Sequence, residues 1–328
     1  MVLDHPRPAE DSPLQMRDIP QPNPAVGEIR VQIRCCGLCH TDLHTVEGDL
    51  SLPKLPIVPG HQIVGVVEAV GPGVQRFREG DRVGIPWLYS TDQTCRFCKR
   101  ELENLCEHAQ FTGLNVNGGY AEAVVVGEDY AYALPDVFSD ENAAPLLCAG
   151  VIGYRSYRLA EARKGETLGL YGFCASAHLV LQLARYSGNE VFVFTRSPRH
   201  QEMAQNLNAD WVGSADDTPP HLLDAAIIFA PSGELVQKAL KMLDKAGRLV
   251  LAGITMTTIP ELDYACLYQE RIIRSVANST RRDVREFLEL AAEVPIKTEV
   301  ECYPLASAND ALVALKHSRL RAAGVLKV

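Results

Sequence analysis

The sequence of 328 residues has no apolar run long enough to cross a membrane as a helix. Basic residues are in the minority, because 32 lysines and arginines stand against 41 aspartates and glutamates, which leaves a formal net charge of −9. This balance argues against nucleic acid as a partner, since binding to a phosphate backbone depends on positive charge. The first residues, 1–6, also lack the basic segment and apolar stretch of a secretory signal.

Cysteine is not scarce, and the chain contains ten. In a chain of this length without a secretory signal, cysteines are more typical of metal ligands and free thiols than of disulfides. We therefore expect a protein of the reducing cytoplasm. The rest of the composition, 47% hydrophobic and 22% charged, is ordinary for a globular protein, and the length favours two domains.

The first half has the pattern of a β domain. Ile29, Val31 and Ile33 alternate with polar residues, which predicts a half-buried strand. Further strands are predicted over 63–70, after the turn at 80–84, and over 120–126, with glycine and proline between them. Many short strands of this kind predict a barrel-like domain.

In the second half, strands alternate with helices, which predicts βαβ units and a parallel sheet. We expect the strands over 168–172, 191–194, 225–229 and 248–252, and the helices over 175–186, 203–207 and 235–243. Beyond them the pattern predicts helices over 285–293 and 308–316 and a last strand over 325–328.

A candidate metal site begins with Cys39 and His61, which lie at two strand ends that folding could bring together. Zinc takes sulfur and nitrogen ligands, and a catalytic zinc site has three protein ligands and one open position. Cys148 is the candidate for the third ligand. The alternative is that the cysteines are buried apolar residues and His61 is a core histidine.

With the stretches Cys-His-Thr-Asp at 39–42 and Pro-Gly-His at 59–61, the chain resembles the zinc-dependent medium-chain alcohol dehydrogenases over nearly its whole length. The resemblance implies an α/β protein with a GroES-like β-barrel catalytic domain, residues 1–149 and 278–328, interrupted by a Rossmann doubly wound parallel-sheet domain, residues 150–277. It implies hydride transfer between a nicotinamide cofactor and a small alcohol, aldehyde or ketone, with Cys39, His61 and Cys148 on a catalytic zinc. It also implies a homodimer or homotetramer.

The resemblance assigns further roles around the metal. Thr41 and His44 match the hydroxyl and histidine that pass the substrate proton to solvent, and both side chains have suitable acid–base chemistry. Asp42 matches a carboxylate that fixes the ring of the histidine ligand. The alternatives are a turn hydroxyl at Thr41 and a surface histidine at His44. Asp42 also suits the start of a helix, and that role is compatible with the one on the histidine.

Three more positions follow from the same match. Gln62 stands where many family members carry a glutamate near the metal, so this chain lacks that charge. His40 occupies a position that faces the cofactor phosphates. Trp87 matches a residue of the substrate pocket, where an indole would favour small substrates; the alternative is ordinary aromatic packing in the core.

A second metal signal is formed by Cys95, Cys98 and Cys106. The family has a structural zinc lobe with four cysteines, and the position of the first is taken here by Asp92. Because an aspartate oxygen can ligate zinc, we expect a site of three cysteines and one aspartate. The alternative is a weak or empty site with exposed thiols.

The cofactor signal is a strand, a glycine-rich turn and a helix. Gly172 and Ala177 match the first and third small residues of the dinucleotide fingerprint, and Cys174 replaces the middle glycine. That replacement places a side chain where the backbone of the family approaches the pyrophosphate.

The next predicted strand ends in Thr195 and Arg196, with Arg199 shortly after, and no carboxylate is present. Guanidinium groups and hydroxyls suit a 2′-phosphate, so we expect NADP(H) in preference to NAD(H). The alternative is a solvated basic loop. Near the end of the chain, Ala323 replaces an arginine that the family aims at the pyrophosphate, and Arg319 or Arg321 could compensate.

Two alternatives to the dehydrogenase hypothesis stay open. One is a zinc-free reductase of quinones or enones from the same superfamily, which would have no use for the three zinc ligands. The other is a catalytically silent binding protein, which the departures at Gln62, Asp92, Cys174 and Ala323 keep under consideration.

Overall fold

The structure, a computed structural model, describes residues 1–320 and 322–328 and divides into two compact units. The first unit consists of Met1–Cys148, Asn278–Glu289 and Thr298–Val328, and the second of Ala149–Ala277 and Leu290–Lys297. Residues 290–297, which we expected in the first domain, therefore belong to the second unit. The side chain of Gln182 ties them there, because it accepts the N–H of Lys297 at 2.7 Å and donates to its carbonyl at 3.1 Å.

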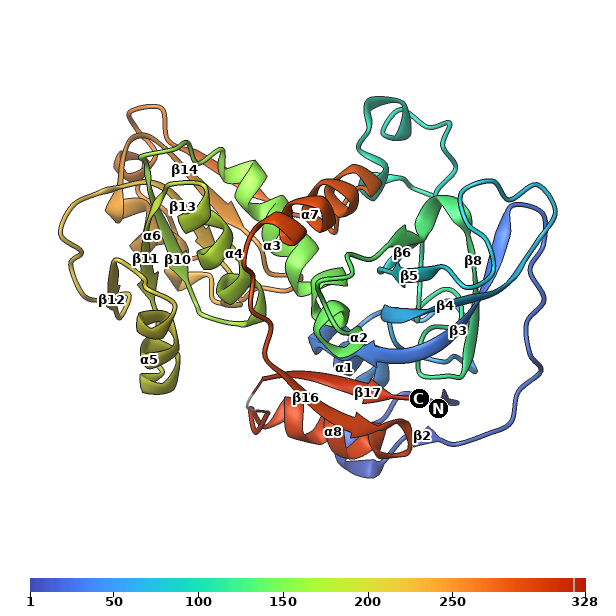
Figure 1. Cartoon of the computed structure of the whole chain (residues 1–328). Coiled ribbons are helices and arrows are strands. Elements are labelled where there is room, and N and C mark those ends of the chain that lie inside the picture. Colours follow the sequence, from blue (N-terminus) through green and yellow to red (C-terminus); the bar gives the residue numbers. More distant parts are fainter. Residues whose placement is uncertain (321) are drawn as a thin grey trace. The chain divides into compact units, whose positions relative to one another are not determined.

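The first unit is built on a seven-stranded sheet. The strand order is β16–β17–β3–β4–β5–β9, and β8 also pairs with β3. The strands are β3 (Glu28–Gly37), β4 (Gln62–Val70), β5 (Arg82–Ile85), β8 (Ala123–Gly127), β9 (Tyr132–Ala133), β16 (Val300–Pro304) and β17 (Ala323–Lys327). In Figure 1 the red strand β17 lies beside the blue strand β3, so the end of the chain completes the sheet that the beginning starts.

Further elements complete this unit. They are the strands β1 (Val2–Leu3), β2 (Leu14–Gln15), β6 (Leu88–Ser90) and β7 (Gln110–Phe111), and the helices α1 (His40–Glu47), α2 (Asp140–Ala143) and α8 (Ala308–Lys316). Helix α7 (Arg281–Glu293) begins in this unit, and its residues from 290 onward belong to the second unit. The alternation predicted along β3 is present, because Ile29, Val31 and Ile33 are all buried in the core of this unit.

The second unit contains a six-stranded sheet in which every pairing is parallel. Its order is β12–β11–β10–β13–β14–β15. The strands are β10 (Thr167–Tyr171), β11 (Glu190–Phe194), β12 (Trp211–Gly213), β13 (Leu223–Ile228), β14 (Leu243–Leu251) and β15 (Ile272–Ser275), and the helices are α3 (Ala149–Ala160), α4 (Ala175–Tyr186), α5 (Pro198–Asn206) and α6 (Glu234–Met242).

Both faces of this sheet are covered. On one face, Leu168 and Leu170 of β10 share a core with Val180 of α4. On the other face, Tyr171 shares a core with Val236 of α6. Burial on both faces explains why the strands of this unit are continuously apolar, as in doubly wound sheets.

Some elements differ from the expectation. The strand predicted from residue 120 begins only at Ala123, because the N–H of Tyr120 donates to the carbonyl of Pro59 at 2.9 Å instead of joining the ladder to β3. Helix α3 and strands β12 and β15 were not predicted, and for α1 only its start was, through Asp42, which lies in its first turn. Across the described ranges, no helix is long and apolar enough to span a membrane.

Candidate active site and metal centres

Cys39 caps the short helix that follows β3. Its Sγ accepts the backbone N–H of Thr41 at 3.4 Å, and Asp42 returns the bond by accepting the N–H of Cys39 at 2.8 Å. This is the reciprocal arrangement of a capping box, with a sulfur in place of the usual hydroxyl. The cap therefore fixes the direction of the Cys39 side chain.

Three sulfur and nitrogen atoms meet beside this cap. Sγ of Cys39 lies 3.4 Å from Nε2 of His61 and 3.8 Å from Sγ of Cys148, and all three ligand atoms lie within 4.8 Å of one another. Around a tetrahedral zinc with ordinary bond lengths, two sulfurs lie about 3.8 Å apart and a sulfur and a nitrogen about 3.5 Å apart. The spacing and the donor set both fit zinc.

A buried carboxylate holds the histidine from behind. Oδ1 of Asp42 lies 2.9 Å from Nδ1 of His61, and both side chains are 2% exposed. Burial lowers the pKa of His61, but the negative charges of Asp42 and Cys39 outweigh burial and raise that pKa well above its usual value. Hydrogen bonding with Cys148 and the charge of His61 lower the pKa of Cys39 despite its burial. A thiolate is thus favoured where a zinc ligand must be deprotonated.

The two predicted proton-relay residues lie on α1. Thr41 and His44 are three residues apart and so share one face of the helix. Nδ1 of His44 lies 2.7 Å from Oδ2 of Asp49, and its side chain is 22% exposed, so it reaches solvent. His40 is exposed on the same helix, with its ring centroid 6.5 Å from that of His44.

Gln62 and Trp87 flank His61 in different ways. The side chain of Gln62 is buried against Gly37, because a Cβ added at Gly37 would lie 2.8 Å from Oε1 of Gln62. Nε2 of Gln62 has no hydrogen-bond partner among the described residues. The half-buried indole of Trp87 lies 6.2 Å from the His61 ring between centroids and stacks on Phe111 at 4.4 Å. Trp87 therefore forms a wall beside the cluster of ligand atoms.

The second cluster gathers Asp92, Cys95, Cys98 and Cys106, whose ligand atoms also lie within 4.8 Å of one another. Oδ1 of Asp92 accepts the N–H groups of Thr94 and Cys95, each at 2.9 Å. These donors hold the pKa of Asp92 well below its usual range, so it is ionised. Three thiols and a carboxylate fit a tetrahedral zinc site.

The predicted dinucleotide turn lies between β10 and α4. Gly172 has φ +84°, and an added Cβ would lie 2.8 Å from the Cβ of Ala230, so a side chain is strained and crowded there. Ala177 is fully buried against the sheet. Cys174 is the N-cap residue of α4, and its exposed side chain makes no capping hydrogen bond. The structure thus places a thiol at the helix start where the fingerprint has glycine.

The end of β11 carries the predicted 2′-phosphate residues. Arg196 and Arg199 are exposed, whereas Thr195 is only 7% exposed. The Ser197 hydroxyl accepts the N–H of His200 at 3.4 Å as the N-cap of α5. The two guanidinium groups are therefore more accessible to a ligand than the Thr195 hydroxyl.

The residues predicted near the last strand are only partly described. Ala323 begins β17, and its N–H donates to the carbonyl of Glu299 at 3.0 Å. Arg319 donates its N–H to the carbonyl of Ala314 at 2.8 Å. Arg321 lies outside the described residues.

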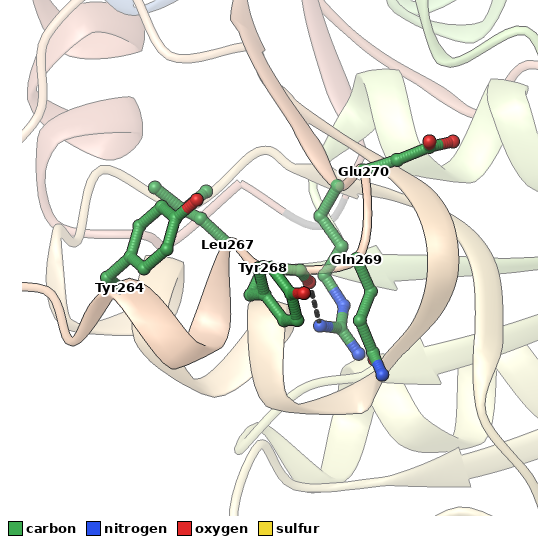
Figure 2. Close-up of a pocket in the computed structure, with 6 residues that line it drawn as sticks. Tyr264, Leu267, Tyr268, Gln269 and Glu270 are labelled. Carbon is green, nitrogen blue, oxygen red and sulfur yellow. Dashed lines mark hydrogen bonds between the residues drawn. The ribbon is translucent and has the colours of Figure 1, made fainter.

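A separate hollow of about 690 Å³ lies on the surface of the second unit (Figure 2). It is lined by consecutive or nearly consecutive residues: Tyr264, Leu267, Tyr268, Gln269, Glu270 and Arg271. The Arg271 guanidinium donates to the carbonyl of Tyr268 at 2.8 Å and to that of Leu243 at 2.9 Å, so it supports the local backbone. None of the predicted site residues lines this hollow.

Two residues that the sequence did not single out hold the sites in place. Glu103, between the lobe cysteines and 5% exposed, accepts the N–H of Arg281 at 2.9 Å at the start of α7. Tyr120, fully buried, packs its ring against Gly60 next to His61. The glycine pair before Tyr120 was a usable signal, since adjacent glycines mark close backbone approach; Glu103 had no such signal.

Comparison with known proteins gives matches in both halves of the chain. The family model described as alcohol dehydrogenase GroES-like domain matches residues 25–136, and that described as zinc-binding dehydrogenase matches residues 177–293. The probable alcohol dehydrogenase AdhA of Mycobacterium tuberculosis is 45% identical, covering 98% of this chain and 95% of its own. An alcohol dehydrogenase of Geobacillus stearothermophilus is 39% identical over 96% of both chains. A solved cinnamyl alcohol dehydrogenase of Sorghum bicolor superposes with a TM-score of 0.90 at 27% identity, covering 99% of this chain and 97% of the other.

Proposed function

The chain belongs to the zinc-dependent medium-chain alcohol dehydrogenase family, and on this basis we propose that it is an alcohol dehydrogenase and aldehyde reductase. It transfers a hydride between a nicotinamide cofactor, NADP(H) in preference to NAD(H), and a small alcohol, aldehyde or ketone. The observation that carries this proposal is the cluster of Cys39, His61 and Cys148, whose spacing suits zinc and whose histidine is held by Asp42.

The cluster would hold the catalytic zinc through two thiolates and Nε2 of His61. A zinc ion bound there supplies Lewis acidity toward an alcohol or carbonyl oxygen. Asp42 accepts the Nδ1 proton of His61, so the other ring nitrogen is left to face the two sulfurs. Trp87 narrows the space beside His61 and so favours small substrates. The lobe of Asp92, Cys95, Cys98 and Cys106 would hold a structural zinc.

The chain also offers a route for the proton. Oxidation of an alcohol sends a hydride from carbon to the nicotinamide and a proton from the hydroxyl to solvent. The Thr41 hydroxyl accepts that proton while it releases its own toward His44, one turn further along α1, and His44 passes a proton on to water. An imidazole has two ring nitrogens, so it can accept a proton on one and release a proton from the other. Asp49, 2.7 Å from Nδ1 of His44, orients the ring.

Cofactor selectivity rests on the second unit. The turn at Gly172 leads into α4, whose N-terminus suits a pyrophosphate. After β11 no acidic residue is available for a ribose 2′-hydroxyl, whereas Arg196 and Arg199 are exposed cations suited to a 2′-phosphate. We further propose a cytoplasmic homodimer or homotetramer, in which the first unit is the catalytic domain and the second unit the dinucleotide domain.

The test is the zinc content of the purified chain together with NADPH and NADH titrations. Two zinc ions per chain, tighter binding of NADPH and turnover of a short alcohol are expected. A chain without zinc that reduces enones would favour the zinc-free reductase instead. A chain that holds zinc but binds neither dinucleotide would overturn the enzyme proposal and favour a silent member whose phosphate site was lost at Cys174 and Ala323.

A further inference from the structure

A segment far along the chain supports the turn that carries His61. Residues 117–120 run beside residues 58–60 and hydrogen-bond to this whole turn. The bonds are Val58 N–H to Asn117 Oδ1 at 3.2 Å, Gly118 N–H to the Val58 carbonyl at 2.7 Å, Tyr120 N–H to the Pro59 carbonyl at 2.9 Å and Gly119 N–H to the Gly60 carbonyl at 3.0 Å. Every carbonyl just before His61 is therefore engaged by this one segment.

Neighbouring atoms also pack closely around Gly60. Gly60 has φ +102°, and a Cβ added there would lie 2.5 Å from Cδ1 of Tyr120. A Cβ added at Gly118 would lie 2.0 Å from the Gly60 carbonyl oxygen, and one added at Gly113 would lie 2.8 Å from both the nitrogen and the oxygen of Gly60. The turn before His61 thus has almost no room to move toward this segment.

The ring of Tyr120, rather than its hydroxyl, makes this contact. The side chain is fully buried, and its hydroxyl has no hydrogen-bond partner within residues 1–320 and 322–328. An unsatisfied buried hydroxyl does not stabilise a fold. The ring of Tyr120 is part of the hydrophobic core of the first unit, and the same ring packs against Gly60.

We propose that Tyr120 is a positioning residue for His61: its ring, held by the bonds of residues 117–120, fixes the peptide at Gly60 and with it the place from which the imidazole points at the metal. Asp42 fixes the ring of the same histidine through Nδ1. The backbone before His61 is thus held by residues 117–120, and its side chain is held by Asp42. A small displacement of a group that must be precisely oriented lowers its effectiveness strongly. This inference rests on the proposed function, because it takes Cys39, His61 and Cys148 to bind zinc.

The test uses Co²⁺ in place of zinc, because its visible absorption reports the geometry of its ligands. The full chain is stripped of metal and titrated with Co²⁺, and the absorption missing in a Cys148→Ser variant defines the contribution of the catalytic site. The variants compared are Tyr120→Phe, Tyr120→Leu and Tyr171→Leu. Tyr171 is a matched control, since it is equally buried, has a hydroxyl without a partner among the described residues and lies in the second unit.

We expect Tyr120→Phe to keep the wild-type spectrum and affinity, with equal or higher thermal stability, because only the unpartnered hydroxyl is lost. Tyr120→Leu should change the spectrum and weaken Co²⁺ about tenfold or more, as loss of a supporting group around a metal ligand does. Tyr171→Leu should lose thermal stability and keep the spectrum. If Tyr120→Leu fails to fold, Gly118→Ala is used instead: its added Cβ would lie 2.0 Å from the Gly60 carbonyl oxygen, so it displaces the same peptide and should alter the spectrum in the same way.

A wild-type spectrum and affinity in Tyr120→Leu would overturn the positioning role. The same spectral change in Tyr171→Leu would overturn it as well, because the effect would then be one of general stability. If the wild-type chain itself shows no Co²⁺ absorption that depends on Cys148, the proposed function fails and this inference falls with it. That result is distinct from the first two, in which the wild-type site binds normally.

Discussion

Replacing Asp42 by asparagine should weaken zinc binding without unfolding the chain. The carboxylate of Asp42 is 2% exposed and serves two donors, His61 Nδ1 at 2.9 Å and the N–H of Cys39 at 2.8 Å. An asparagine has one side-chain acceptor, so it can serve only one of them, and its NH₂ group then faces the other donor. One charge-assisted bond is lost, next to two zinc ligands at once.

The size of the effect follows from that single bond. A hydrogen bond to a charged group contributes about 1.5–3 kcal/mol, and about 1.4 kcal/mol is a factor of ten, so zinc affinity should fall roughly 10- to 150-fold. Loss of a supporting partner behind a metal-bound histidine typically costs about 10–100-fold in affinity, which agrees. Burial raises the pKa of Asp42, so the ionised form is costly in the metal-free chain, and asparagine removes that cost. We therefore expect Asp42→Asn to lower zinc affinity more than it lowers the free energy of unfolding of the metal-free chain.

The assay is a competition titration of the catalytic zinc against a chromophoric chelator, with urea unfolding of the metal-free chain alongside. Asp49→Asn is the matched control: its carboxylate pairs with His44 at 2.7 Å but is 57% exposed and supports no proposed zinc ligand, so its zinc affinity should equal that of wild type. Unchanged zinc affinity in Asp42→Asn would refute the reasoning. An equal loss of zinc affinity in Asp42→Asn and in Asp49→Asn would refute it as well.

Three further predictions concern the departures from the family pattern. Arg196→Ala should weaken NADPH at least about tenfold more than NADH, because a charge-assisted contact to the 2′-phosphate is lost; equal losses in fluorescence titrations would contradict the NADP(H) preference. Cys174→Gly should tighten both dinucleotides, and an unchanged Kd in calorimetry would mean that the turn already accommodates the thiol. Asp92→Ala should release the lobe zinc to a chelator faster than wild type and Asp92→Cys more slowly, since thiolates are the better zinc ligands; equal rates would exclude Asp92 as a ligand.

The family and the fold class predicted from the sequence are confirmed by the two family models and the relatives. The second unit was the easier part, because continuously apolar strands and amphipathic helices are local patterns: the helix expected over 175–186 is α4, Ala175–Tyr186. The start of helix α1 was indicated by Asp42, but its N-cap was not, since that residue is Cys39 and a sulfur is not an ordinary capping signal. The grouping of each set of candidate ligands follows from the resemblance to the family, whereas the distances between the ligand atoms come only from the structure.

Tyr120 shows where local patterns stop being informative. The residues after it form a mostly apolar run that continues as a strand, so the prediction extends back to residue 120. In the folded chain its N–H bonds Pro59, across about sixty residues of sequence, and its ring packs against Gly60. Tertiary contacts of this kind override a local preference, and nothing in the sequence states which distant turn a glycine pair will approach.

The metal lobe and helix α7 form a similar long-range connection. Glu103 accepts both the N–H of Arg281 at 2.9 Å and its Nε at 3.4 Å, although 178 residues separate them. The Arg281 guanidinium also lies 5.3 Å from the ring of Tyr130, whose hydroxyl is 2.8 Å from that of Thr91, directly before Asp92. Contacts to both ends of the lobe thus converge on the first turn of α7, which a sequence motif for four ligands cannot reveal. If the four proposed ligands bind one zinc, that ion also fixes the positions of Glu103 and Thr91, so we expect it to stabilise the contacts between the lobe and the first turn of α7.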